Sequence, residues 1–328
     1  MRKEYKWGIL GPGKIAHRFT EGLKLLDNAV LHAVGSRDPE RAKEFATQYG
    51  YRNSYGSYEE FVSDPDMDVV YVASPHSHHM EHSLMCLEAG KSVICEKAFA
   101  INSWEVEQMK ALAASKSLFL MEALWPPFQP SYLKAYELLD RGGLGALVTM
   151  RSYFAFKPPY EPEKRLYNPE LGGGALLDIG IYPVIDALTF LGLPDSINAI
   201  ASFDRTGTDD NIDILFGYAD GTSASLYASL KNNAGIGTEL IFESGVISLK
   251  RMSDGKQVTV LNKEGSEEEI FEYQPEARGF QYEAMEVMRC MDKGLLESEK
   301  VPLSFSTDLI NTLDRIRKLA GIVYNDRE

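Results

Sequence analysis

The chain has 328 residues, of which 44% are hydrophobic and 25% are charged, a composition typical of a folded protein with roughly two domains. This composition argues against a disordered chain, a collagen-like repeat and a small disulfide-stapled protein. Lys and Arg number 34 against 48 Asp and Glu, a formal net charge of −14 that repels nucleic acid and anionic lipid, so we expect a small-molecule substrate and no nucleic-acid or membrane partner.

Short apolar runs alternate with helical segments in the N-terminal part of the chain. The runs expected to be strands are residues 7–10, 31–34, 69–72, 92–95 and 118–121. Strands separated by helices form a parallel sheet that helices cover on both faces. We therefore predict an α/β protein that begins with a doubly wound, Rossmann-like domain over residues 1–124.

The pattern changes after Pro126 and Pro127. Helices are expected over 131–140 and, at the end of the chain, over 305–324. Strands are expected at 148–154, 212–216, 223–227, 246–249, 258–261 and 270–273, with hairpin turns at Asp254-Gly255 and Glu264-Gly265. We therefore predict an α+β domain over 125–328 with a large, mostly antiparallel sheet. Its open face is a candidate for helix cover or self-association, and its last helix could pack back on the first domain.

The cysteines and the hydropathy pattern bear on location. Cys86, Cys95 and Cys290 contain no C-x-x-C pair, which argues against a disulfide framework and a thiolate zinc cluster. The first residues carry charges and a glycine motif in place of the apolar core of a signal peptide. We expect a soluble, cytoplasmic protein.

A glycine-rich turn follows the first expected strand and opens a helix. Its sequence, Gly11-Pro12-Gly13-Lys14-Ile15-Ala16, matches the G-x-G-x-x-A pattern of dinucleotide-binding sites. Gly11 permits the tight turn, Gly13 lets the backbone approach a pyrophosphate, and Ala16 keeps the helix close to the sheet. The amides of the first helical turn, at Lys14 and Ile15, offer positive charge to the anion. A glycine turn selected only for packing is the alternative.

The residues after the second expected strand bear on which dinucleotide binds. An NAD site usually presents an acidic residue there, whereas this chain has Ser36-Arg37-Asp38, with Arg41 one helical turn further. Ser36, Arg37 and Arg41 can hold a 2′-phosphate, which favours NADP and leaves NAD as the alternative. Asp38 could still reach a ribose hydroxyl, and the arginines could form a solvated basic face.

Four of the six histidines, His76, His78, His79 and His82, lie in one short segment. His78 and His82 have the i, i+4 spacing of ligands on a helix, but no carboxylate pair or thiolate completes a coordination set, so we predict no metal site. Ser74-Pro75-His76 is expected to form a turn at the carboxyl end of a parallel strand, where such sheets bind ligands. His76 is therefore a candidate for cofactor and substrate contact.

Glu96-Lys97 follows another expected strand at the same edge of the sheet. A nicotinamide ring would lie at this edge, so both residues are candidates for cofactor contact. The ammonium group of a lysine there would lower the pKa of a neighbouring phenol, which makes Lys97 a candidate catalytic residue.

Asp178 and Tyr182 are four residues apart and share a face of an expected apolar helix. Both are candidates for catalysis and substrate contact. The structural alternatives are a helix N-cap for Asp178 and a half-buried core aromatic for Tyr182. Trp125 and Phe154 could form aromatic walls of a substrate pocket or pack in the core.

Taken together, these motifs resemble those of the Gfo/Idh/MocA family of oxidoreductases, in particular its dimeric dihydrodiol dehydrogenase and NADP-dependent D-xylose dehydrogenase branch. The resemblance rests on the glycine turn, Ser36-Arg37-Asp38, Ser74-Pro75-His76, Glu96-Lys97, Met121-Glu122-Ala123-Leu124-Trp125 and the run from Gly172 to Tyr182. It implies a C-terminal domain for substrate binding and dimerisation, a catalytic Lys97, and Tyr182 as the acid/base where many relatives have histidine.

Ala98 departs from the usual Glu-Lys-Pro pattern of this family. In that pattern the peptide bond before the proline is cis. The bond between Lys97 and Ala98 is therefore either a non-proline cis bond or a trans bond that shifts Lys97.

The leading hypothesis is reversible oxidation of a secondary alcohol of a sugar, polyol or cyclic diol. NADP would exchange the hydride, Tyr182 the hydroxyl proton, Lys97 would stabilise the phenolate, and Asp178 would orient Lys97 or the substrate. Alternatively, Lys97 itself is the acid/base and Tyr182 orients the substrate. A noncatalytic NAD(P)-binding regulator and an NAD-dependent glycosidase on the same fold are the rival functions.

Overall fold

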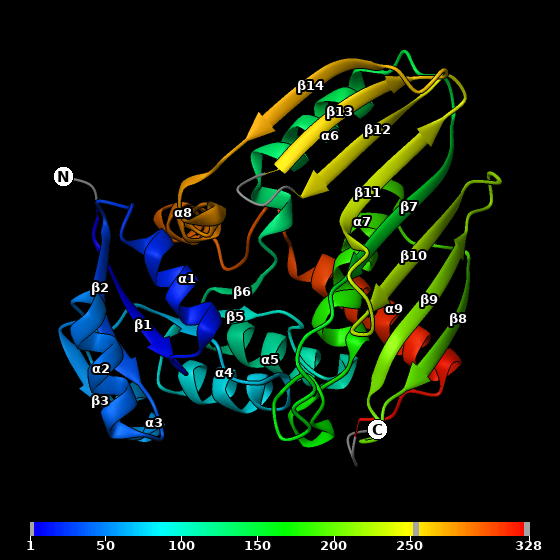
Figure 1. The fold of residues 1–328 in the computed structure, drawn as a ribbon. Helices are drawn as coiled ribbons and strands as arrows, with labels where there is room; N and C mark the ends of the chain where they lie inside the picture. Colours follow the sequence, from blue (N-terminus) through cyan, green and yellow to red (C-terminus); the bar gives the residue numbers. More distant parts are fainter. Residues whose placement is uncertain (1–2, 252–255, 325–328) are drawn as a thin grey trace. The chain divides into compact units, whose positions relative to one another are not determined.

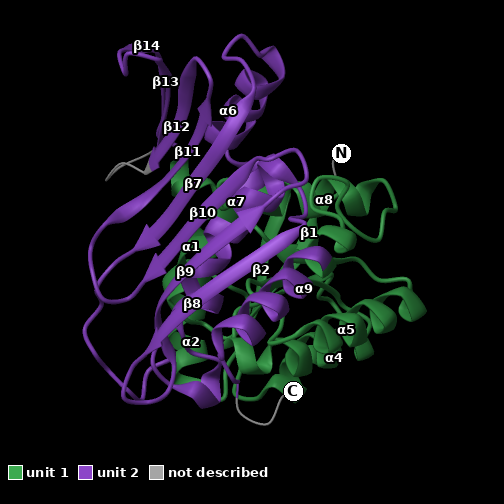
Figure 2. Cartoon of the chain, turned by 90° about the vertical axis from the view of Figure 1, so that its right-hand side faces the viewer, with its two compact units in different colours: residues 1–125, 276–307 green, residues 126–275, 308–328 purple. Residues whose placement is uncertain are grey.

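The computed structural model describes residues 3–251 and 256–324 (Figure 1). The chain forms two compact units, coloured separately in Figure 2. Unit 1 comprises residues 1–125 and 276–307, and unit 2 comprises residues 126–275 and 308–328. The domain boundary after residue 124 stays a prediction.

Unit 1 is built on a six-stranded parallel sheet in the order β3-β2-β1-β4-β5-β6. Its strands are β1 (Tyr5–Leu10), β2 (Ala29–Gly35), β3 (Asn53–Tyr55), β4 (Val69–Val72), β5 (Ser92–Glu96) and β6 (Leu120–Ala123). The chain adds strands first to one side of β1 and then to the other, so the sheet has a switch point between β1 and β4. The predicted Rossmann-like architecture is confirmed.

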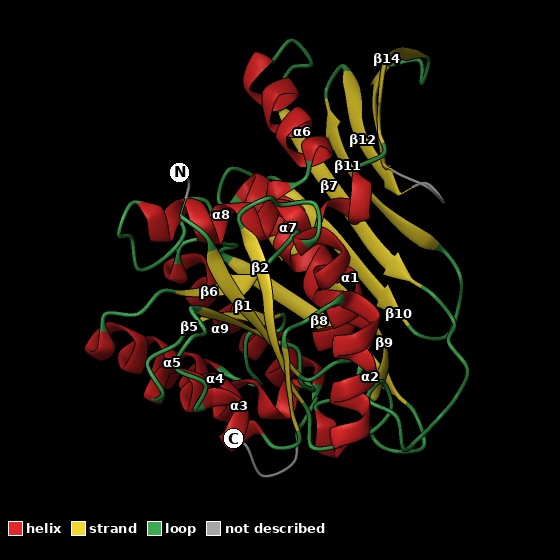
Figure 3. Cartoon of the chain, turned by 90° about the vertical axis from the view of Figure 1, so that its left-hand side faces the viewer, coloured by secondary structure: helices red, strands yellow, loops and turns green. Residues whose placement is uncertain are grey.

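The helices of unit 1 follow the strands in alternation (Figure 3). They are α1 (Lys14–Leu23), α2 (Pro39–Tyr49), α3 (Tyr58–Val62), α4 (His79–Glu88), α5 (Ser103–Lys116) and α8 (Gln281–Asp292), with the 3₁₀ turns η1 (His76–His78) and η5 (Glu276–Gly279). Right-handed crossovers place α1 and α4 on opposite faces of the sheet, because their strands lie on opposite sides of β1. The sheet strands β1, β4 and β5 are accordingly almost entirely buried.

A late segment of the chain completes unit 1. The Tyr5 hydroxyl donates to the Asp292 carboxylate at 2.7 Å, and the Leu120 amide donates to the Leu296 carbonyl at 3.0 Å. Residues far apart in sequence thus tie the inner strand β1 and the edge strand β6 to the segment that carries α8.

Unit 2 is built on an eight-stranded sheet in the order β14-β13-β12-β11-β7-β10-β9-β8. Its strands are β7 (Leu147–Ala155), β8 (Ser196–Phe203), β9 (Asp209–Gly217), β10 (Ser223–Ser229), β11 (Gly235–Phe242), β12 (Gly245–Arg251), β13 (Lys256–Asn262) and β14 (Glu267–Tyr273). Only β7 and β10 pair in parallel, so the sheet is mostly antiparallel, as predicted.

Helices pack on one face of this sheet. The helical elements described in unit 2 are η2 (Pro126–Phe128), α6 (Pro130–Arg141), η3 (Pro169–Leu171), η4 (Leu176–Gly180), α7 (Ile181–Leu191) and α9 (Leu303–Ala320), which begins in unit 1. α6 covers β12 to β14, and α7 covers β7 and β10. On the opposite face, side chains such as Leu215 and Ile200 are exposed, which confirms the open face.

The predicted turns and ends differ from the structure in a few places. The strand expected over 118–121 is β6, which begins two residues later because Ser117 adopts positive φ and Leu118 still bonds to Ala113 at the end of α5. The Glu264-Gly265 turn joins β13 to β14 as predicted. Asp254-Gly255 lies outside the described residues.

One described helical stretch, Pro169–Leu191, is long and apolar enough to cross a membrane by length and composition alone. Its most apolar window is 83% buried inside the protein. Burial against the sheet of unit 2 therefore accounts for its apolar composition.

Candidate active site

The glycine turn joins the ends of three strands of unit 1. Gly11 has φ of +88°, and a Cβ there would lie 3.2 Å from the Ala73 carbonyl oxygen, just after β4. The Gly11 amide donates to the Gly35 carbonyl at the end of β2 at 3.0 Å. Gly13 is the N-cap of α1 and provides no side-chain cap, so the first amides of that helix, at Lys14, Ile15 and Ala16, are available to an anion.

The side chains after β2 surround the start of α2. Asp38 is the N-cap of α2 and accepts hydrogen bonds from the amides of Glu40 and Arg41. The Arg41 Nε donates to the Pro12 carbonyl of the glycine turn at 3.1 Å. The structure therefore brings Arg41 to the predicted phosphate-binding turn and gives Asp38 a structural role.

Ser36 and Arg37 lie beside this cap. The Ser36 hydroxyl accepts from the Asp38 amide at 3.1 Å, and Ser36 is buried. Arg37 is exposed and hydrogen bonds the Tyr58 hydroxyl. One buried hydroxyl and two guanidinium groups thus gather at the carboxyl end of β2.

The Ser74-Pro75-His76 turn ends β4 and leads into η1, as predicted. His76 is buried, and its ring contacts that of His79 edge to face. His79 lies 2.7 Å from the Ser74 carbonyl through Nε2 and 2.7 Å from the Ala98 carbonyl through Nδ1. Burial lowers the pKa of His79 to about 4, and its contacts with the two backbone carbonyls oppose that shift. His79 therefore connects the turn after β4 to the peptide that carries Lys97.

Glu96 and Lys97 lie at the end of β5, at the same edge of the sheet. The Glu96 carboxylate accepts from the buried Tyr71 hydroxyl and from the Lys97 amide, the latter at 3.2 Å. The peptide bond between Lys97 and Ala98 is cis, which answers the alternative left open by the missing proline. Lys97 itself is half-buried.

Glu122 on β6 supports the segment after Lys97. Its carboxylate accepts from the Phe99 amide at 3.0 Å and is 1% exposed. Burial raises the pKa of Glu122 to about 7, an effect that the neighbouring Glu96 increases. Trp125, three residues later, contacts the Phe280 ring at 5.9 Å between centroids.

Asp178 lies in unit 2, in the π-helical turn η4. Its carboxylate is buried and forms an ion pair with Arg165, whose side chain is 55% exposed. Asp178 is therefore not a helix N-cap. Single π-helical turns are frequent at functional sites, where they change the direction of side chains.

Tyr182 is the second residue of α7, four residues after Asp178. Its ring packs against that of Phe154 on β7, with centroids 5.3 Å apart and planes tilted by 37°. Tyr182 and Phe154 are both half-buried. The structure thus brings together Asp178, Tyr182 and Phe154 within unit 2.

The candidate residues fall into two groups. Unit 1 carries the glycine turn, Ser36, Arg37, Arg41, Ser74, Pro75, His76, Glu96, Lys97 and Trp125, and unit 2 carries Phe154, Asp178 and Tyr182. Within the described residues, no group of three or more His, Cys, Asp or Glu side chains is placed to hold a metal ion. The assignment of these residues to cofactor and substrate stays a prediction.

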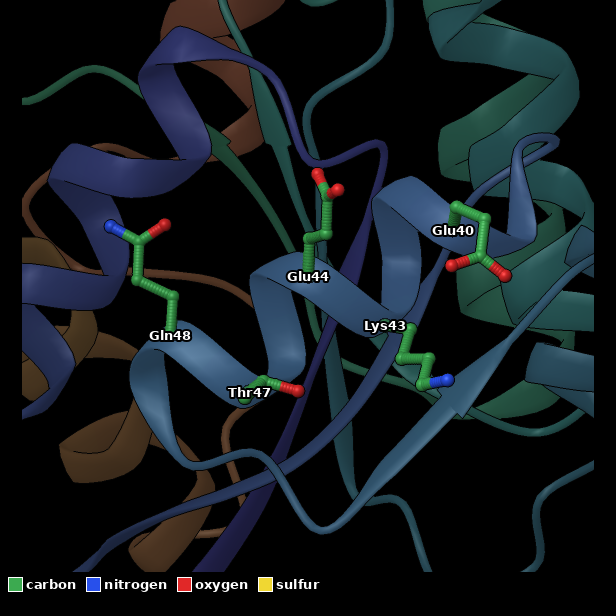
Figure 4. A pocket seen from close by; sticks show the side chains of 5 residues that line it. All are labelled: Glu40, Lys43, Glu44, Thr47 and Gln48. Carbon is green, nitrogen blue, oxygen red and sulfur yellow. The ribbon is translucent and has the colours of Figure 1, made fainter.

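A shallow hollow on the surface of unit 1 is not a second candidate active site. Its lining residues are Glu40, Lys43, Glu44, Thr47 and Gln48, and Figure 4 shows all of them on α2. A single helix supplies these side chains, so the hollow cannot surround a small-molecule ligand.

Sequence reasoning missed three supporting residues. Glu122 entered only as part of a motif, His79 only as one of four clustered histidines, and Arg165 was not among the candidate residues. The charge of Arg165 and its position in a loop without period gave no signal that it pairs with Asp178. The bonds of His79 and Glu122 join segments that only the folded sheet brings together.

The chain is similar in sequence to known proteins over nearly all of its length. Residues 5–124 match the model of an oxidoreductase family with an NAD-binding Rossmann fold, and residues 132–248 match the GFO/IDH/MocA C-terminal domain. Trans-1,2-dihydrobenzene-1,2-diol dehydrogenase of Mus musculus is 35% identical over 333 residues, covering 97% of this chain and 98% of its own. The Homo sapiens protein of the same name is also 35% identical, over 331 residues, with 97% and 98% covered.

Solved structures are similar as well. An aldose-aldose oxidoreductase from Caulobacter crescentus, crystallised with glycerol, is 25% identical, has a TM-score of 0.86 and covers 97% of this chain and 98% of its own. A 3-ketoreductase from Actinomadura kijaniata, in complex with NADP and TDP-benzene, has a TM-score of 0.89 over the same shares at 24% identity. This second similarity is one of fold.

Proposed function

Because the chain belongs to the Gfo/Idh/MocA family of oxidoreductases, we propose that it transfers a hydride between NADP and a secondary alcohol or carbonyl of a sugar, polyol or cyclic diol. The names of its relatives support this class, since one is a dehydrogenase of a cyclic diol and another an oxidoreductase of aldoses. The observation that carries the proposal is the uncapped N-terminus of α1 behind the glycine turn, which fits a dinucleotide pyrophosphate.

The residues after β2 favour NADP over NAD. Asp38 caps α2, so the acidic residue that could bind the ribose diol of NAD is already engaged. Arg37 and Arg41 would hold the 2′-phosphate, with the Ser36 hydroxyl beside them. Arg41 is already fixed by its bond to the Pro12 carbonyl, which reduces the entropy lost on binding.

We assign the proton chemistry to Tyr182 and Lys97. The nicotinamide ring of the cofactor supplies the hydride acceptor or donor when it is bound. Tyr182 would exchange the substrate's hydroxyl proton, and the Lys97 ammonium would stabilise the phenolate by charge and hydrogen bonding. Asp178, held by Arg165, would orient a substrate hydroxyl or Lys97.

The decisive experiment compares Tyr182→Phe and Lys97→Met with the control Tyr160→Phe, which removes an exposed phenol. Tyr182→Phe keeps the ring that packs against Phe154, so the fold should be retained. We expect both site variants to lower kcat by at least about 100-fold, the usual size of an acid–base contribution. The control should retain full turnover. Near-normal turnover in Lys97→Met would refute the assignment.

A mild effect of Tyr182→Phe with a severe effect of Lys97→Met would instead make Lys97 the acid/base. The rival functions are separated by a panel of aldoses, inositols and diols assayed with NADP and NAD. Net reduction of cofactor identifies a dehydrogenase. Release of a leaving group without net reduction identifies a glycosidase. If neither reaction occurs, the remaining alternative is a noncatalytic regulator.

We also propose that a second copy of the chain covers the open face of the eight-stranded sheet. Leu215 and Ile200 are 49% and 74% exposed there. The charged Asp213 lies opposite Ile200 on the neighbouring strand, and the charged Arg151 lies in the same cross-strand row as Leu215. Apolar side chains bordered by both charge signs suit a two-fold interface. Sedimentation equilibrium should give a dimer that Leu215→Lys converts to monomer, while Leu25→Lys, an exposed apolar site on unit 1, leaves it intact.

A further inference from the structure

A buried carboxylate lies directly beneath the turn that carries Asp178. Asp209, at the start of β9, is 0% exposed. Its Oδ2 accepts from the Leu176 amide at 2.6 Å, and the Ala175 amide also hydrogen bonds the carboxylate. These two amides belong to the first turn of η4, where helix geometry leaves N–H groups without partners in the helix itself. Asp209 therefore caps η4 from a neighbouring strand.

The backbone before η4 is shaped around this carboxylate. Gly174 has φ of +125°, a conformation that favours glycine. A Cβ at Gly174 would lie 2.0 Å from the Asp209 Oδ1, so no larger residue fits. The Gly174 amide is held by the Leu166 carbonyl at 3.0 Å, which anchors the turn to the preceding loop.

We infer that Asp209 is a positioning residue for the proposed reaction: its carboxylate fixes the start of η4 and thereby the orientation of Asp178 and Tyr182. This inference rests on the proposed roles of those two residues. It follows from the order along the chain, because Asp209 holds residues 175 and 176, Asp178 comes two residues later, and Tyr182 lies in the first turn of α7, which continues from η4. A small rotation at the cap moves both side chains.

The groups around Asp209 make this support sensitive to pH. Burial raises the pKa of Asp209 to about 7, the adjacent Asp210 raises it further, and the two amides of η4 oppose the shift. Tyr324 also faces the carboxylate, with Arg317 and Asp314 of α9 beside it. The carboxylate is therefore ionised above pH 7 and binds the amides more strongly there than below pH 7, because a charged acceptor makes the stronger hydrogen bond.

The test replaces Asp209 with Asn, which keeps the shape and one acceptor oxygen but cannot ionise. The matched control is Asp210→Asn, on the same strand, whose carboxylate accepts from Ser202 and pairs with Lys231. We expect Asp209→Asn to lower kcat about tenfold at pH 8, and this gap from wild type should close below pH 6. The KM for NADP should not change. Asp210→Asn should keep the wild-type kcat at pH 8.

A loss of kcat that is the same at every pH would overturn the inference, because a role in packing alone does not depend on ionisation. Equal kcat in wild type and Asp209→Asn would also overturn it. If Tyr182→Phe and Lys97→Met both remain fully active, the proposed function fails instead, whatever Asp209→Asn does.

A second measurement needs neither a variant nor turnover. Hydrogen exchange of the wild-type protein, corrected for intrinsic rates, should show the Leu176 amide about tenfold less protected at pH 6 than at pH 8. The Val93 amide, which bonds to the Phe119 carbonyl at 2.9 Å in the sheet of unit 1, is the internal reference. Equal protection of the Leu176 amide at both pH values would refute the role of Asp209.

Discussion

The Asp38 carboxylate accepts a hydrogen bond from the Arg41 backbone amide at 3.3 Å, in the first turn of α2. It also accepts from the Glu40 amide at 3.1 Å. A single side chain thus caps the helix and sets the direction in which Arg41 leaves it. The Arg41 guanidinium then reaches the Pro12 carbonyl, so the acidic cap positions a basic residue at the glycine turn.

Arg37→Met should weaken binding of NADP and leave binding of NAD unchanged, because only NADP carries a 2′-phosphate. Loss of one charge-assisted pair at an exposed position corresponds to roughly 1.5–3 kcal/mol, or a KM for NADP raised about 10- to 100-fold. Steady-state kinetics with both cofactors measures this. Lys43→Met is the control, since Lys43 is an exposed cation on α2, the helix that begins two residues after Arg37 (Figure 4). Equal losses in the two variants would mean that only the general field of the helix matters.

Asp38→Ala should destabilise the protein and weaken the preference for NADP without weakening the use of NAD, because the cap that positions Arg41 is lost. Removing an N-cap costs about 1 kcal/mol, which thermal unfolding can measure. The ratio of kcat/KM for NADP and NAD is the second readout. A fall in kcat/KM for NAD alone would show that Asp38 binds the ribose diol.

Glu122→Gln should stabilise the protein at pH 8 and have little effect at pH 4.5. Burial raises the pKa of Glu122 from 4.5 to about 7, so the folded state binds its proton more tightly than the unfolded state does. The stability that this group contributes is therefore lost as the pH rises from about 4.5 to about 7. A shift of this size corresponds to on the order of 3 kcal/mol at most.

Unfolding temperatures of wild type and Glu122→Gln across this range provide the check. Glu88→Gln, at an exposed carboxylate paired with Lys116, should show no such trend. A constant difference between wild type and Glu122→Gln at all pH values would contradict the prediction.

Gly174→Ala should be far more damaging than Gly192→Ala. Both glycines have positive φ, but nothing lies within 4 Å of a Cβ at Gly192, whereas a Cβ at Gly174 would collide with Asp209. Backbone strain alone costs about 1–2 kcal/mol, and the collision should raise the loss at Gly174 to about 3 kcal/mol or more. Denaturant unfolding separates the two. Similar losses would mean that the turn relaxes around the added methyl group.

Much of unit 1 could be predicted because its signals are local. The strand ending at Leu10, the turn at Gly11 and the helix from Lys14 follow one another within a few residues, and each has its own pattern. β3 was not predicted because Asn53–Tyr55 is too short to show the alternation of a strand. α8 could be recognised only through its contacts, since nothing near Gln281 indicates that the segment returns to the first sheet.

In unit 2, sequence alone was least informative about long-range pairing. β11 contains Gly235 and Gly237, which interrupt the alternation expected of a strand, yet it lies beside the central β7. Asp178 and Tyr182 were found because their spacing is helical. Asp209 was not predicted, because it lies 33 positions from Leu176 in the sequence and the hydrogen bond between them depends on the register of β9.

The path of the chain between the units limits how the protein can be divided. The chain leaves unit 1 after Trp125, returns at Glu276 and leaves again within α9, so no contiguous stretch contains all of unit 1 without most of unit 2. A fragment that stops after Trp125 would lose the hydrogen bond between Tyr5 and Asp292 and the one between Leu120 and Leu296. A dinucleotide-binding fragment for independent expression therefore has to be assembled by joining residue 125 to residue 276 with a linker.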